Sequence, residues 1–183
     1  MLLTRAIAAF AAACAAGCPL FEKAAEPCAI DGTTELGIVI ADQNGNLTAL
    51  AEMGEVPLIA APQGGHILLA APRIKMTTAT CEVQVTASLR DLSTNIVIGL
   101  EQRPIRVHQR ADGWATPPDP ADLSDLANVA VCPSSVSMVA GIPARLEVKI
   151  VDPDGSATVT TALDAIPTCG DSQYCVYECN GAN

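Results

Sequence analysis

Eight cysteines divide this chain of 183 residues into two chemically different parts. Cys14 and Cys18 lie in an alanine-rich N-terminal stretch, and the other six are spread over a more polar remainder. These six are Cys28, Cys81, Cys132, Cys169, Cys175 and Cys179. An even number of cysteines in a short chain predicts a disulfide framework. Such frameworks are typical of exported proteins in oxidising compartments. Three covalent cross-links would constrain the fold more than any other feature of the sequence.

The N-terminal stretch predicts an export signal. Arg5 supplies a positive charge, and the apolar run 6–13 is far shorter than the roughly 20 residues needed to span a bilayer. Ala15-Ala16-Gly17-Cys18 resembles the lipobox of bacterial lipoproteins, with Ala15 where that pattern prefers Leu. The resemblance implies a signal peptide over residues 1–17 and lipid attached to Cys18, which would hold the chain at a membrane surface.

Two other processing sites remain open. Cleavage at an Ala-x-Ala site within residues 11–15 would give a secreted, non-lipidated protein. Cleavage before Cys14 would leave an odd, unpaired cysteine. We favour lipidation of Cys18, because one discarded and one acylated cysteine leave six to pair. Pro19 follows where an acidic residue would retain a lipoprotein in the inner membrane, so the outer membrane is favoured.

Six cysteines allow fifteen pairings, and the sequence does not choose among them. We expect Cys81 to pair with Cys132, and Cys28 to pair with the C-terminal cluster. Zinc is the alternative use of these residues. Cys175 and Cys179 are separated by three residues, but no second close pair of Cys or His accompanies them. Disulfides are therefore favoured over a metal.

Composition excludes some partners. The formal net charge is −10, which disfavours nucleic acid and polybasic contact with anionic lipid, because both need clustered Lys and Arg. Aromatic residues make up 3% of the chain, which lowers the case for a flat carbohydrate-binding platform. We therefore expect a core of Val, Ile, Leu and Ala, membrane contact through the N-terminal lipid, and no nucleic acid.

Short segments of β character follow one another along the remainder, and none shows a sustained helical period. Residues 81–90 alternate most clearly between apolar and polar side chains, as in a strand buried on one face. The predicted strands are 35–41, 47–52, 56–61, 66–71, 81–90, 95–100, 105–109, 128–132, 144–151 and 156–163.

Turn signals separate these segments. Residues 42–46 carry a strong hairpin signal, and 152–155 (Asp-Pro-Asp-Gly) predict another turn. Pro72 is expected to end or bulge its strand, because proline cannot donate a ladder hydrogen bond. Residues 111–128 are expected to form an irregular crossover, in which Asp119 caps one helical turn beginning at Pro120.

These elements predict an all-β, antiparallel β-sandwich of the immunoglobulin or fibronectin type. A jelly roll or a small barrel is the competing architecture. The predicted organisation is a signal peptide at 1–17, a tether at 18–30, the sandwich domain at 31–168 and a disulfide-linked C-terminal tail at 169–183.

One motif carries a family resemblance. Pro62-Gln63-Gly64-Gly65-His66 leads into a strand and is followed later by Cys81-Glu-Val-Gln-Val. This pattern resembles a group of uncharacterised bacterial envelope lipoproteins with an immunoglobulin-like sandwich, over residues 35–168. The resemblance implies an envelope location and a sandwich fold, and it carries no activity.

The same motif holds the candidate binding residues Gln63, Gly64, Gly65 and His66. Two glycines could let a ligand approach the backbone beside His66. We favour the simpler interpretation, in which Gly64 and Gly65 form a tight turn or bulge and His66 bonds to a neighbour. The alternative function is a periplasmic metal-handling protein that uses His66 and His108, although no spacing requires it.

Other chemistry has weaker support. Asp31, Asp152 and Asp154 could suggest a calcium loop, but the six or more oxygen ligands that calcium takes are not evident, so turn chemistry explains them better. No Gly-x-Ser-x-Gly elbow occurs. We expect no enzyme activity and no cofactor. The predicted role is binding or structural, toward another envelope protein, a polymer or an unidentified ligand.

Overall fold

The computed structural model describes residues 26–119, 122–134, 138–152 and 155–181. The predicted signal peptide, Cys18 and most of the predicted tether lie outside these ranges. Within them the chain is built mainly of strands, so the all-β prediction is confirmed. None of the helices in the described ranges is long and apolar enough to cross a membrane.

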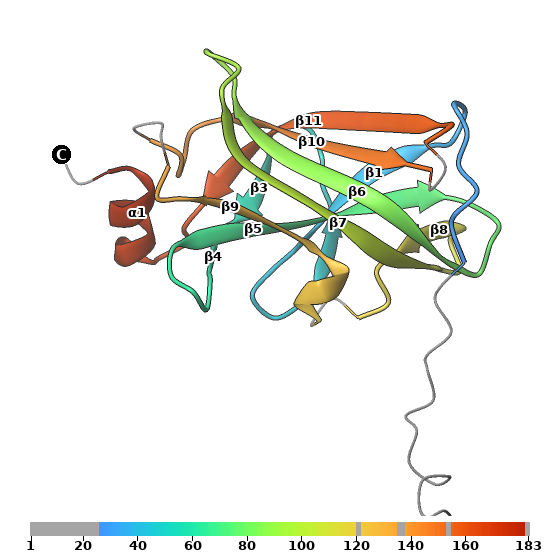
Figure 1. Ribbon diagram of the computed structural model, residues 1–183. Coiled ribbons are helices and arrows are strands. Elements are labelled where there is room, and N and C mark those ends of the chain that lie inside the picture. The colour runs from blue at the N-terminus through green and yellow to red at the C-terminus, as the bar shows by residue number, and fades with distance from the viewer. Residues whose placement is uncertain (1–25, 120–121, 135–137, 153–154, 182–183) are drawn as a thin grey trace, which may run out of the picture.

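Strands far outnumber helices along the described chain (Figure 1). In order, the elements are β1 (Leu36–Ala41), β2 (Leu47–Ala49), β3 (Gly54–Pro57), β4 (Ile59–Ala60), β5 (His66–Lys75), β6 (Thr80–Asp91), β7 (Val97–Gln109), β8 (Trp114–Thr116), the 3₁₀ turn η1 (Leu123–Asp125), β9 (Ala127–Cys132), β10 (Ala144–Val151), β11 (Thr158–Thr168) and α1 (Gln173–Cys179).

All of these strands belong to one mixed sheet. The hydrogen-bonded order is β2-β1-β5-β8-β7-β6-β10-β11-β3, and β4 and β9 also pair with β5. Every pairing between named strands is antiparallel except that of β3 with β11, which is parallel. The prediction of a purely antiparallel sheet is therefore wrong at this edge. After the β1–β2 hairpin the chain crosses to the far end of the sheet, where β3 meets β11 running in the same direction.

The sheet curves around an aliphatic core. Strand β9 contacts β6 and β7 without sharing a named pairing with either, and β1 contacts β11 although they lie far apart in the strand order. The inward side chains are almost all Val, Ile, Leu and Ala. Strand β6 has the predicted alternation, with Val83, Val85 and Leu89 buried. The expectation of an aliphatic core is thus confirmed.

Two prolines lie inside strands where the sequence predicted ends or breaks. Strand β5 continues through Pro72, which pairs with Ile38 on β1. On the other side of β5, β9 pairs with residues 66–70 and β8 with residues 74–75. Pro72 therefore lies opposite the gap between β9 and β8, where no ladder hydrogen bond is required. Pro104 lies within a continuous β7, so the two strands predicted at 95–100 and 105–109 are one.

Part of the predicted tether belongs to the folded domain. Pro27 forms a parallel bridge with Glu82, and the Cys28 amide donates to the Glu82 carbonyl at 2.8 Å. Cys28 is buried and disulfide-bonded to Cys81. Residues 26–28 of the predicted tether therefore pack on the sheet, because β6 offers this segment backbone partners and a covalent link.

Three short elements differ from expectation. The crossover predicted at 111–128 contains β8, whose Trp114 and Ala115 pair with β5. A 3₁₀ turn, η1, capped by the Asp122 carboxylate, follows in this region, and the turn predicted to begin at Pro120 lies outside the described residues. The C-terminal tail contains a helix, α1, where no helix was expected.

Candidate functional site at the α1 end of β5

The Pro-Gln-Gly-Gly-His motif forms a tight turn that leads into β5. The Gly64 amide donates to the Ala61 carbonyl at 3.0 Å, and the Ala61 amide donates to the Gly65 carbonyl at 3.0 Å. Gly64 and Gly65 have φ of 93° and 78°, in the left-handed region that glycine adopts without strain. The pairing register with β9 then shifts between His66 and Ile67. Of the two simpler interpretations of these glycines, a tight turn or a bulge, the structure has the tight turn.

His66 is buried against the C-terminal helix. Its side chain is 4% exposed, and its Nδ1 lies 2.6 Å from Oε2 of Glu178, whose side chain is 19% exposed. The Tyr174 hydroxyl donates to the other oxygen of the same carboxylate at 3.2 Å, which raises the pKa of Tyr174. The rings of His66 and Tyr174 lie 6.0 Å apart. A chain of three polar side chains therefore runs from the interior to the surface.

Helix α1 provides both Glu178 and the neighbouring cysteines. Ser172 caps its first turn by accepting from the Cys175 amide at 3.2 Å. Cys175 and Cys179 are four residues apart, so they share the helix face that is turned inward. Tyr174 and Tyr177 are 66% and 62% exposed. The helix thus buries sulfur on one face and presents aromatic rings on the other.

Two disulfides attach this helix to the sheet and to the loop before it. Cys179 pairs with Cys132 at the end of β9, and Cys175 pairs with Cys169 just after β11. The expected links of Cys81 to Cys132 and of Cys28 to the C-terminal cluster are wrong. The reason is topological, because β6 runs beside residues 26–28 while β9 ends beside α1. Three disulfides indicate an oxidising compartment outside the cytosol.

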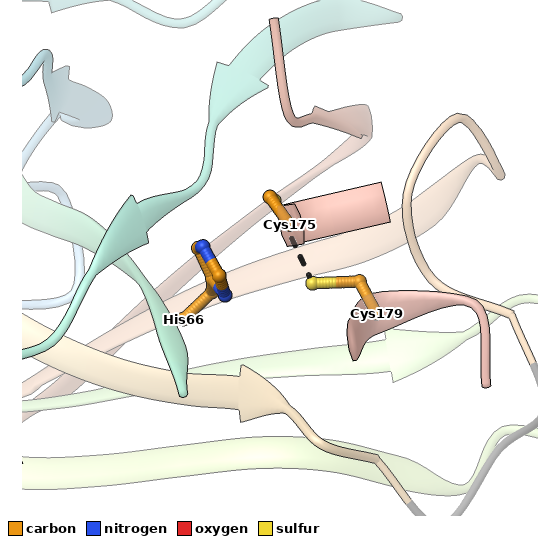
Figure 2. Close-up of side chains that lie close together, drawn as sticks. All are labelled: His66, Cys175 and Cys179. Carbon is orange, nitrogen blue, oxygen red and sulfur yellow. Dashed lines mark hydrogen bonds between the residues drawn. The ribbon is translucent and has the colours of Figure 1, made fainter. Parts of the chain in front are cut away.

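His66, Cys175 and Cys179 form one compact cluster (Figure 2). A ring nitrogen of His66 and the two Sγ atoms all lie within 4.8 Å of one another. Zinc binds thiolate sulfur, but both of these sulfurs are already in disulfides. In the disulfide form these residues therefore do not provide a metal site.

The structure does not bring His66 and His108 together. His66 begins β5, and His108 pairs with Thr116 on β8, which joins the opposite end of β5. Ten residues of β5 separate these ends, about 30 Å at the usual rise per residue. His108 instead shares a hydrogen bond of 2.7 Å with the Thr80 hydroxyl. A metal site that uses both histidines has no support in this arrangement.

The four candidate binding residues are also not on one surface. Gln63 and Gly64 are exposed at the tip of the turn, Gly65 is half-buried against the backbone of Cys132, and the His66 ring is buried. The exposed part of the motif is a turn tip. Its buried part supports the packing of α1 on β5.

The acidic residues considered for calcium have local partners. The Asp31 carboxylate accepts from the hydroxyl and amide of Thr33, which lowers its pKa. The Asp152 carboxylate accepts from the hydroxyl of Ser156, just after the predicted 152–155 turn, at 3.0 Å. Asp154 lies outside the described residues. Turn chemistry accounts for the two that are described.

The opposite end of β5 carries a second cluster, which the sequence did not predict. The Arg73 guanidinium lies 4.3 Å from the centre of the Trp114 ring, and Lys75 Nζ lies 5.3 Å from it. Arg73 also forms an exposed ion pair with Asp112 at 3.2 Å. Trp114 comes to this place because β8 pairs with the last residues of β5.

The missed part of the site is α1 and its contact with His66. Ser172 as a capping residue and the four-residue spacing of Cys175 and Cys179 were the available signals. The contact of Glu178 with His66 joins residues 112 positions apart, and no local pattern indicates it. Neither a family model, nor a curated protein sequence, nor a solved structure matches this chain. The functional argument therefore rests on the residues themselves.

Proposed function

We propose that this chain is a lipid-anchored protein of the bacterial cell envelope with a binding or structural role. Its β domain is proposed to be a variant of the immunoglobulin- or fibronectin-like sandwich, with one parallel edge pairing added. The lipobox-like Ala15-Ala16-Gly17-Cys18 supports lipid attachment at Cys18, and the three disulfides support an exported location. Pro19 supports sorting to the outer membrane.

The exposed face of α1 is the observation that carries the binding role. Two disulfides hold this short helix in place, and Tyr174, Val176 and Tyr177 are all exposed on it. Tyrosine is enriched at protein interfaces, because its ring buries a large apolar area while its hydroxyl bonds at the edge. The domain is acidic, so the favoured partner is another envelope protein or polymer that lacks strong negative charge.

Fractionation of cells that express the full chain tests the anchor. Wild-type protein is expected in the membrane fraction, with the acylated Cys18 peptide found by mass spectrometry. Cys18→Ser is expected to release the domain into the soluble fraction, whereas Cys14→Ser changes neither location nor mass. A soluble wild-type protein cleaved before residue 18 would instead establish the secreted alternative.

Cross-linking in intact envelopes tests the surface. The double variant Tyr174→Ser/Tyr177→Ser is expected to lose the cross-linked species that wild type forms. Leu100→Ala, which removes a well-exposed apolar side chain from β7, is the control and retains the cross-linked species. Equal cross-linking by all three proteins would show that α1 is not the binding surface.

A further inference from the structure

Two disulfides touch each other beneath α1. Sγ of Cys175 lies 3.8 Å from Sγ of Cys179, and each of these atoms is bonded to a different partner, Cys169 and Cys132 respectively. The dashed line in Figure 2 joins these two sulfurs. Neither sulfur carries a hydrogen in the disulfide form, so the contact is one of van der Waals packing. Four sulfur atoms therefore form one continuous group.

Access to this group is unequal. Cys175 and Cys179 are each 1% exposed and Cys132 is 5% exposed, whereas Cys169 is only partly buried. Residues 170–173, Val176 and Tyr177, which follow Cys169 and flank Cys175 in the chain, line a shallow depression of about 310 Å³. Four of these lining residues belong to the short loop that the Cys169–Cys175 bond closes. An external thiol therefore reaches Cys169 more readily than the other three sulfurs, and access decides which sulfur is attacked.

We propose that these four cysteines form a thiol–disulfide relay, which passes a reduction from the surface at Cys169 to the buried Cys132. The co-reactant is a dithiol reductant. Its thiolate attacks Sγ of Cys169, which breaks the Cys169–Cys175 bond and releases Cys175 as a thiolate. The second thiol of the reductant then attacks the mixed disulfide. The reductant departs as a cyclic disulfide, and Cys169 is left as a thiol.

The second exchange occurs inside the protein. The Cys175 thiolate attacks Sγ of Cys179, the neighbouring sulfur at 3.8 Å. A Cys175–Cys179 bond forms, the Cys132–Cys179 bond breaks, and Cys132 leaves as a thiolate that takes up a proton. In total the dithiol loses two electrons and two protons. One protein disulfide is lost, one is exchanged, and the two protons end on Cys169 and Cys132.

The surroundings of the sulfurs suit this exchange. Residues four apart on a helix are neighbours, with Cβ atoms about 5–6 Å apart, so a Cys175–Cys179 bond requires the short helix to loosen locally but needs no new pairing of distant elements. A ring nitrogen of His66 lies within 4.8 Å of both sulfurs, and Glu178 fixes the ring through Nδ1 at 2.6 Å. The imidazole therefore lies beside both sulfurs in a fixed orientation. The relay goes beyond the proposed anchoring and binding role and does not depend on it.

Partial reduction of the wild-type protein tests the relay. The purified chain is treated with less than one equivalent of dithiothreitol, quenched in acid, and alkylated. Cleavage at Tyr177 or Glu178 separates Cys175 from Cys179 for mass spectrometry. Singly reduced protein is expected to contain alkylated Cys132 and Cys169 and a Cys175–Cys179 disulfide. Singly reduced protein that carries label only on Cys169 and Cys175 would overturn the proposal, as would first reduction at Cys28–Cys81.

A matched pair of variants separates exchange from loss of a disulfide. Cys169→Ser and Cys175→Ser remove the same bond, but only Cys169→Ser leaves a thiol at the position that contacts Cys179. When free thiols are alkylated, the alkyl label is expected on Cys132 in Cys169→Ser. In Cys175→Ser it is expected on Cys169 alone. Identical retention of Cys132–Cys179 in both variants would contradict the relay. The wild-type experiment decides the matter if either variant does not fold.

Discussion

The two ends of β5 each hold a neighbouring segment of the chain, α1 at one end and β8 at the other, by different side-chain interactions. At the His66 end, a buried imidazole, a largely buried carboxylate and two disulfides hold α1 on the sheet. At the Lys75 end, a half-buried Arg73 and an exposed Asp112 lie beside a half-buried Trp114. Charges in water are screened and contribute little, whereas a buried polar group that loses its partner is costly. The α1 end should therefore respond far more strongly to mutation.

Removal of whole disulfides should produce the largest effects. The Cys28–Cys81 and Cys132–Cys179 bonds have sequence separations of 53 and 47, and loops of this size imply about 4 kcal/mol each from chain entropy. Double alanine variants of each pair can be compared by urea unfolding. We expect the loss of Cys132–Cys179 to cost more, because α1 also detaches from His66. A smaller loss at this bond than at Cys28–Cys81 would reverse the comparison.

The short Cys169–Cys175 loop provides an internal scale for these measurements. Its separation of 6 residues implies about 2 kcal/mol by the same entropy relation. The double alanine variant of this pair should therefore be the least destabilised of the three. A loss as large as that of the longer loops would mean that packing, rather than chain entropy, dominates at α1.

Single polar substitutions should have the next largest effects on the free energy of unfolding, and these effects should differ between the two ends of β5. Glu178→Ala leaves the buried His66 without its carboxylate, and we expect a loss of about 1–3 kcal/mol in the free energy of unfolding. Asp112→Asn removes the exposed charge but keeps an oxygen for the Trp114 amide, so we expect a change within about 0.5 kcal/mol. Chemical denaturation measures both. Equal losses would show that burial does not distinguish the two clusters.

A smaller contribution to folding stability should come from the exposed turn after Asp91, which lies at neither end of β5, and it should depend on pH. Hydrogen bonds from the Ser93 and Thr94 hydroxyls and from the Thr94 amide lower the pKa of Asp91 to about 2 from an ordinary 3.8. A lowered pKa in the folded state stabilises the fold above the ordinary pKa, and this contribution disappears as pH falls through about 2. Asp91→Ala should therefore destabilise the protein more at pH 7 than at pH 2.

Thermal melting of the wild type and of Asp91→Ala across this range provides the measurement. The two melting temperatures are expected to converge between about pH 4 and pH 2, where the carboxylate becomes protonated. A difference that stays constant with pH would mean that the hydroxyl and amide bonds to Asp91 do not depend on its charge.

Local features of the fold were predictable because their causes are local. The alternation of β6 and the hairpin at 42–46 follow from side-chain polarity and turn chemistry within a few residues. Strand β10 has the predicted bounds, because its apolar positions alternate without interruption. The prolines misled the prediction, since whether Pro72 breaks a strand depends on which neighbour pairs beside it.

The candidate site was less predictable because it is assembled from distant segments. The sequence singled out His66 as a candidate, but its partner Glu178 lies 112 residues away. The disulfide pairing depends on the same long-range topology, since Cys132 meets Cys179 only because β9 ends beside α1. Sequence spacing contains no information on this proximity, so the number of bonds was predictable and their partners were not.

The positions of the disulfides also determine how the protein responds to a cut in its backbone. A single cleavage between residues 28 and 81, or between 132 and 179, leaves both fragments joined by a covalent bond. No disulfide bridges the segment from 82 to 131, so one cut there divides the chain into two separable pieces once it is denatured. A protease that cuts the 91–96 turn would therefore leave two pieces held only by non-covalent contacts, whereas a cut at the exposed turn containing Gln63 leaves two pieces still joined by Cys28–Cys81.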